Sequence, residues 1–82
     1  MVLRIGAIIP VMIAANERLR LRFAHAAQTH ERAARVHASA AALFDCLGRP
    51  EAAARERAAA EVETGKAEAA WQEAGRFNQE SG

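Results

Sequence analysis

The sequence predicts an all-α fold, an antiparallel two-helix hairpin, on three observations. Alanine provides 22 of the 82 residues, with only two prolines and no tyrosine, a composition typical of long helices. Apolar residues recur at helical spacing from Leu19 to Leu47. Gly48 and Pro50 then stand where such a helix would end and a second one would begin.

Residues 1–15 are apolar, and we expect them to lie outside the hairpin as a disordered extension or a misassigned start, since Met12 is a second methionine. The run from Ile5 to Ala15 is far shorter than the roughly 20 residues that span a bilayer. With Arg4 before it, the run also fits a secretory signal or a segment at a membrane surface. A packed strand or helix start is the remaining alternative. We expect a cytoplasmic protein, with export or membrane-surface attachment as the alternative.

The first helix of the hairpin is expected over about residues 17–47. Asn16 is a suitable N-cap residue for it, because a short polar side chain can accept a hydrogen bond from the first turn. A 3–4 spacing then defines one seam over four heptads. The seam consists of Leu19, Phe23, Ala26, His30, Ala33, His37, Ala40, Phe44 and Leu47, and Val36 and Leu43 widen it on one side.

The turn is expected at residues 48–49. Glycine adopts the left-handed conformation that closes a helix, and Arg49 precedes a proline and is therefore biased towards extended backbone. Pro50 suits the first turn of the next helix. These residues predict that the first helix ends, that a tight turn follows, and that the second helix begins directly after it.

The second helix is expected over about residues 50–77, with a mostly alanine inner face. Gly65 weakens its middle by about 1 kcal/mol, which favours a bend or break there. The hairpin domain would then comprise residues 16–78, and residues 79–82 would fray.

Association with another chain is expected because alanine buries little area and a monomer of this size would have a thin core. We expect a homodimer that forms a four-helix bundle, or a complex with another helical protein. The first 50 residues carry seven arginines and three acidic residues, whereas the remainder carries four basic and seven acidic residues, which favours antiparallel packing. The predicted partner interface is Leu19, Phe23, His30, His37, Phe44, Leu47, Val62 and Phe77.

The histidines His30 and His37 lie on the seam, two helical turns apart. Histidine pairs that bind a metal on one helix are normally three or four residues apart, so no metal and no cofactor is predicted. We expect imidazoles that are hydrogen-bonded across an interface, and acidification should then weaken association by placing charges in the seam. Cys46 is the only cysteine, a small apolar residue or one half of a disulfide between two chains.

The alternative function uses an arginine-rich face of the first helix as an anionic-surface contact for nucleic acid or a membrane. Its residues are Arg18, Arg20, Arg22 and Arg32. A net charge of only +1 favours a solvated face instead. Because the chain has one aspartate, no serine–histidine–acid setting and no glycine-rich phosphate loop, we predict a non-enzymatic protein that mediates protein–protein association in a structural or adaptor role.

One segment resembles a single tetratricopeptide repeat, and it reads HASAAALFDCLGRPEAAARERAAAEVETG. The small, aromatic and turn positions of that family are matched by Ala41, Phe44, Gly48, Ala53 and Ala60. The departures are His37 for tryptophan, Ala40 for leucine, Arg57 for an aromatic residue and Gly65 for proline. The family implies a peptide-binding groove, but about three stacked units are needed to build one, so other chains would have to complete this unit. The chain is also similar to short alanine-rich helical hairpins of unknown function from high-GC bacteria, a resemblance that implies no activity.

Overall fold

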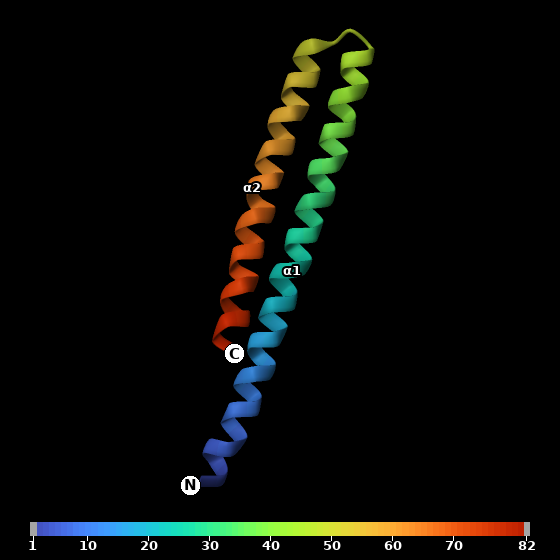
Figure 1. Ribbon diagram of the computed structural model, residues 1–82. Coiled ribbons are helices and arrows are strands. Elements are labelled where there is room, and N and C mark those ends of the chain that lie inside the picture. The colour runs from blue at the N-terminus through green and yellow to red at the C-terminus, as the bar shows by residue number, and fades with distance from the viewer. Residues whose placement is uncertain (1, 82) are drawn as a thin grey trace.

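The computed structural model is a hairpin of two α-helices that lie side by side and run in opposite directions (Figure 1). Helix α1 comprises Val2–Cys46 and helix α2 comprises Pro50–Ser81. The structure describes the backbone of residues 2–81 and the side chains of residues 8–77. The molecule is a rod of 71 × 14 × 13 Å, and the predicted all-α hairpin is confirmed.

The start of α1 differs from the expectation, because the helix begins at Val2 and not near residue 17. Asn16 lies inside the helix and is not its N-cap, since the preceding turns already supply carbonyl partners for the N–H groups that a cap would serve. Pro10 also lies inside α1 and removes one backbone donor without ending the helix. As a result, α1 projects well beyond the end of α2 (Figure 1).

The turn has the predicted geometry. Gly48 has a φ of 70°, the left-handed conformation that closes a helix. The Gly48 N–H donates to the Asp45 carbonyl at 3.1 Å, and the Arg49 N–H donates to the Phe44 carbonyl at 2.8 Å. These two bonds form a Schellman motif, which satisfies carbonyls left open at the end of α1. The helix itself ends at Cys46, close to the expected Leu47.

Helix α2 is continuous and does not break at Gly65. Ala67 and Ala74, which follow this glycine, are buried against α1. Their packing holds the helix together at a position where glycine costs about 1 kcal/mol relative to alanine. Residues 79–81, which were expected to fray, belong to α2, and Gly82 lies outside the described residues.

The core of the hairpin is a stripe of alanines. No described side chain larger than alanine is fully buried, and the buried residues are Ala27, Ala41, Ala52, Ala53, Ala67 and Ala74. Most of them recur at multiples of seven residues on their helix, which is the period of a coiled-coil seam. Such small side chains allow the two helix backbones to approach closely.

Larger seam residues flank the alanine stripe and are only half-buried. Phe23 and Phe77 stack at the open end of the hairpin, with their ring centroids 5.7 Å apart. At the turn end, the Arg49 guanidinium lies 5.6 Å from the centre of the Phe44 ring. Aromatic contacts therefore close the paired region at both ends.

The two glycines Gly48 and Gly65 should respond oppositely to replacement by alanine. We expect Gly48→Ala to lower the free energy of unfolding by about 1 kcal/mol, because alanine is strained at positive φ. Gly65→Ala should raise it by about 0.5–1 kcal/mol, because a Cβ there meets nothing within 4 Å and alanine favours the helix. Thermal unfolding followed by circular dichroism measures both, and equal shifts for the two variants would contradict the assigned turn.

Candidate functional site

Two histidine–glutamate pairs join the helices across the seam. His30 Nδ1 lies 2.5 Å from Glu63 Oε2, and His37 Nδ1 lies 2.6 Å from Glu56 Oε2. A step of seven residues forward along α1 is matched by a step of seven residues back along α2. The two pairs therefore occupy equivalent positions of one antiparallel heptad pattern.

A second set of polar contacts follows the same register on another side of the seam. Arg57 Nη1 donates to Asp45 Oδ2 at 2.8 Å, and the Trp71 indole N–H donates to the Glu31 carboxylate. Between these two contacts the chain moves two heptads forward along α1 and two heptads back along α2. These pairs are exposed, so each stabilises the hairpin by well under 1 kcal/mol, but together they fix which turns of the helices face each other.

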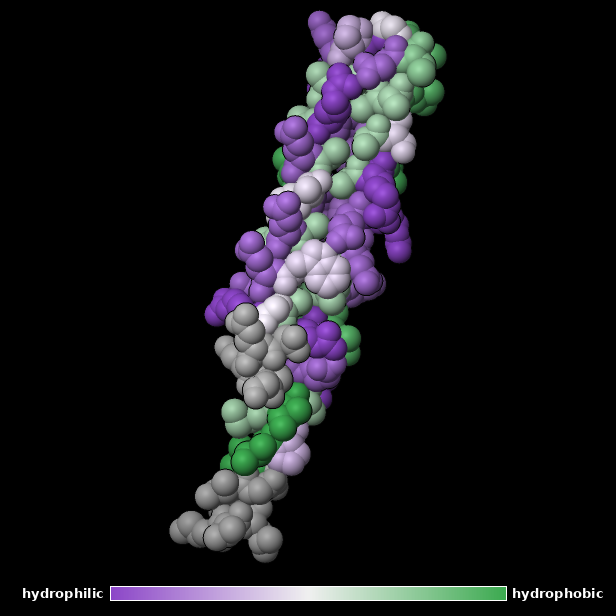
Figure 2. All heavy atoms as spheres, in the orientation of Figure 1, coloured by the Kyte–Doolittle hydropathy of each residue, from purple (hydrophilic) through white to green (hydrophobic). Residues whose placement is uncertain are grey.

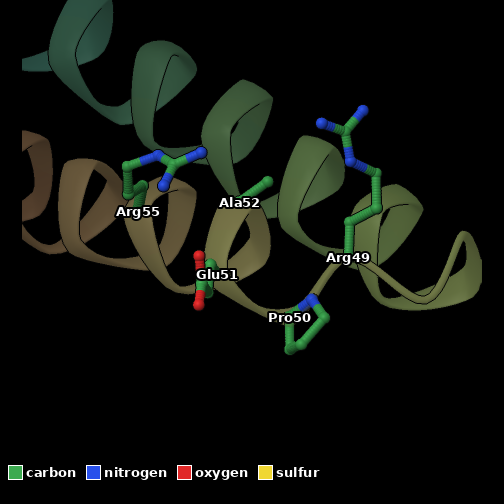
Figure 3. Close-up of a pocket in the computed structure, with 5 residues that line it drawn as sticks. All are labelled: Arg49, Pro50, Glu51, Ala52 and Arg55. Carbon is green, nitrogen blue, oxygen red and sulfur yellow. The ribbon is translucent and has the colours of Figure 1, made fainter.

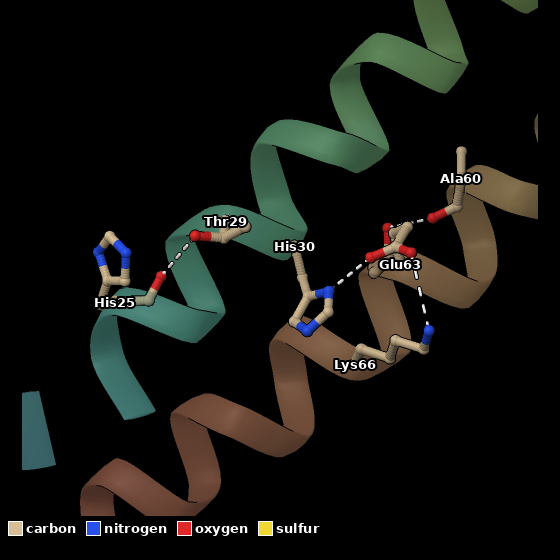
Figure 4. Close-up of polar contacts among 7 residues, drawn as sticks. His25, Thr29, His30, Ala60, Glu63 and Lys66 are labelled. Carbon is tan, nitrogen blue, oxygen red and sulfur yellow. Dashed lines mark hydrogen bonds and ion pairs between the residues drawn. The ribbon is translucent and has the colours of Figure 1, made fainter. Parts of the chain in front are cut away.

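In the His30–Glu63 hydrogen bond, the donor and the acceptor can be assigned (Figure 4). A carboxylate can only accept, so the Nδ1 of the imidazole carries the hydrogen and donates it. Lys66 adds a cation 3.8 Å from the other oxygen of Glu63. The hydrogen bond from His30 lowers the pKa of Glu63 below its ordinary value of 4.5, the charge of Lys66 adds to this effect, and partial burial opposes it.

His30 and His37 face α2 within the hairpin, and their partners were not foreseen. We expected hydrogen bonds across an interface between chains, but the acceptors Glu56 and Glu63 belong to the same chain. The available signal was the seven-residue spacing of these two glutamates, which equals that of His30 and His37. Among the described side chains, no three His, Cys, Asp or Glu residues form a group that could hold a metal ion.

One side of the hairpin carries a group of exposed aliphatic side chains. Val36 and Leu43 each directly precede a seam residue of α1, and Val62 directly precedes the seam residue Glu63 of α2. Because the helices are antiparallel, the residue before a seam position lies on the same side of the hairpin in both helices. On this side, Arg55 and Lys66 of α2 lie beside small and aliphatic residues. We call these small and aliphatic residues the apolar face, and they are Ala33, Val36, Ala40, Leu43 and Leu47 of α1 and Ala59, Val62 and Ala69 of α2.

The His–Glu pairs border the apolar face. At 100° per residue, Val36 and Val62 are one step from His37 and Glu63, whereas the buried alanines lie on the far side of these pairs. Figure 2 shows a contrasting view, in which purple polar side chains follow both helices and the stronger green lies mainly along the edges and on the projecting part of α1.

The residues predicted for a partner interface divide into two groups. Leu47 and Val62 are exposed on the apolar face. The others are half-buried on the side of α1 or α2 that faces the seam within one chain, and they are Leu19, Phe23, His30, His37, Phe44 and Phe77. Val36 and Leu43, which were not in the predicted set, are among the most exposed large side chains.

The predicted arginine face is also divided. Arg18, Arg22 and Arg32 are exposed and form no ion pair with any side chain that the structure describes. Arg20 instead turns towards the seam, where it is half-buried and pairs with Glu17. Its place beside Ala74 and Gly75 of α2 removes it from the exposed arginine face.

The surface depressions of the described region are shallow. The one at the turn is lined by Arg49, Pro50, Glu51, Ala52 and Arg55 (Figure 3). Its two guanidinium groups extend from the ribbon and do not converge on the glutamate carboxylate (Figure 3). Cys46 is a free thiol and is exposed.

Comparison with known proteins adds no assignment. The chain matches no protein-family model, no curated protein and no solved structure. Within the described residues, neither helix has a stretch that is both long and apolar enough to cross a membrane. The tetratricopeptide resemblance and the likeness to alanine-rich hairpins stay predictions.

The Glu63 carboxylate should make the hairpin sensitive to acid. Its pKa is lower in the folded chain than the ordinary 4.5, so its contribution to stability is complete above about that pH and is lost as the pH falls through the folded value. We expect the free energy of unfolding to fall less between pH 6 and 3 in Glu63→Gln than in wild type, as measured by urea unfolding. Glu61→Gln, at an exposed position, is the control and should keep the wild-type slope.

Proposed function

We propose that the chain is a non-enzymatic protein that associates with a second copy through the apolar face, giving a four-helix bundle with a structural or adaptor role. The observation that carries this proposal is an inverted distribution of side chains. The buried residues are alanines, while Val36, Leu43, Leu47 and Val62 are 63%, 58%, 61% and 56% exposed. We also propose a cytoplasmic location, since an exposed thiol such as that of Cys46 fits a reducing compartment.

The gain from association can be compared with the gain from folding. A buried alanine methyl group contributes about 0.8 kcal/mol, and the hairpin buries few of them. Covering the exposed part of a valine or leucine contributes roughly 1 kcal/mol or more. The large residues of the apolar face, present twice in a dimer, would therefore add a hydrophobic term comparable with that of the alanine core itself.

The apolar face alternates small and large side chains. Ala33, Ala40 and Ala59 lie between the larger Val36, Leu43 and Val62, an alternation that suits knobs-into-holes packing between two copies. Charge favours an arrangement in which α1 of one copy lies on α2 of the other. Residues 1–50 have seven basic and three acidic residues, a net charge of +4, whereas residues 51–82 have four basic and seven acidic residues, a net charge of −3.

Replacing apolar-face residues with a charged residue should prevent association. We expect wild type to have the mass of a dimer in light scattering and Leu43→Glu/Val62→Glu to have the mass of a monomer, because four buried carboxylates would lack partners. The control is Leu21→Glu, since Leu21 is 53% exposed but lies two residues before Phe23, about 160° away from the seam. A monomeric wild type, or a dimeric double variant, would contradict the proposal.

A further inference from the structure

The part of α1 that projects beyond α2 exposes a cluster of large apolar side chains. Figure 2 shows this segment as a green band between two grey regions. We call residues 8–13 the apolar overhang. All of its large side chains are more than half exposed, and they are Ile8, Ile9, Val11, Met12 and Ile13.

The overhang is apolar around its whole circumference. At 100° per residue, its side chains point in every direction from the helix axis, and the sequence has no charged residue between Arg4 and Glu17. A partner helix would cover one side of such a segment and leave the other in water. A helix that is apolar on all sides is typical of a lipid or fully buried environment.

Two exposed arginines follow the overhang along α1. Arg18 and Arg22 follow it within α1, are exposed and have no ion-pair partner among the described side chains. Their position, one to three turns beyond Ile13, is where the phosphates of a lipid surface would meet a helix whose apolar end is inserted. Long arginine side chains can reach such phosphates while their apolar stems stay in the interface.

We propose that the overhang inserts into the surface of a membrane that contains anionic lipids, with Arg18 and Arg22 at the level of the headgroups. The apolar run of residues 5–15 is about 16 Å long, roughly half of the hydrocarbon thickness, so it enters the interface without crossing the bilayer. Leu43 of the apolar face lies about 45 Å away along α1, so the lipid contact and the proposed dimer contact do not overlap.

Vesicle flotation tests this inference on the full chain. We expect wild type to float with phosphatidylcholine–phosphatidylglycerol vesicles and to bind vesicles of phosphatidylcholine alone at least tenfold more weakly. Ile9→Glu/Ile13→Glu should reduce binding to the anionic vesicles by about tenfold or more, because two charges would enter the acyl region. Arg18→Ala/Arg22→Ala should reduce that binding by about tenfold and remove most of its salt dependence.

Two controls separate this inference from the proposed dimer. Leu43→Glu/Val62→Glu should bind vesicles like wild type even where it has lost association, and Ile9→Glu/Ile13→Glu should keep the wild-type mass and helical circular dichroism. Absence of wild-type flotation would overturn the inference, as would unchanged flotation of Ile9→Glu/Ile13→Glu. A changed oligomeric mass in Ile9→Glu/Ile13→Glu without vesicle binding by wild type would show that another protein chain covers the overhang, which also overturns it.

Discussion

The close approach of two helices along a stripe of alanines is the constraint on which the rest of the structure depends. Small side chains such as Ala27, Ala53 and Ala67 bring the backbones together, and they leave little space for anything larger at the same level. Larger seam residues are therefore displaced to the edge, where His30 and His37 meet carboxylates of α2. The aliphatic residues are displaced further, onto an exposed side. The thin core, the polar edge and the apolar face therefore all result from the close approach of the two helices.

The parts of the fold that depend on neighbouring residues could be predicted from the sequence. Gly48 and Pro50 specify the turn because their backbone preferences act within one or two residues, and both helices follow from the spacing of apolar residues. The His–Glu pairs were missed because they depend on the relative rotation of two helices, which one helix does not determine. The start of α1 was misplaced because Asn16 is a local capping signal, and the propagation of an established helix overrides it.

Two surfaces with different chemistry lie far apart on one rod. The apolar face lies near the turn and is bordered by polar pairs, whereas the overhang is at the opposite end and is followed by exposed arginines. Because α1 is continuous from Val2 to Cys46, it carries both the overhang and the α1 part of the apolar face, and the orientation of one fixes the orientation of the other. A dimer formed through the apolar face would accordingly hold two overhangs at fixed positions.

The short connection at residues 47–49 affects whether α1 pairs with α2 of its own chain or with α2 of a second molecule. Contacts that repeat every seven residues allow several similar registers of α1 against α2, and the short turn favours one of them in addition to the polar pairs. If the Schellman motif opened, α1 could make the same alanine, phenylalanine and His–Glu contacts with α2 of a neighbouring molecule. The chain would then exchange helices in a domain-swapped dimer, with every contact of the hairpin preserved. Gly48 is therefore the residue that keeps these contacts within one molecule.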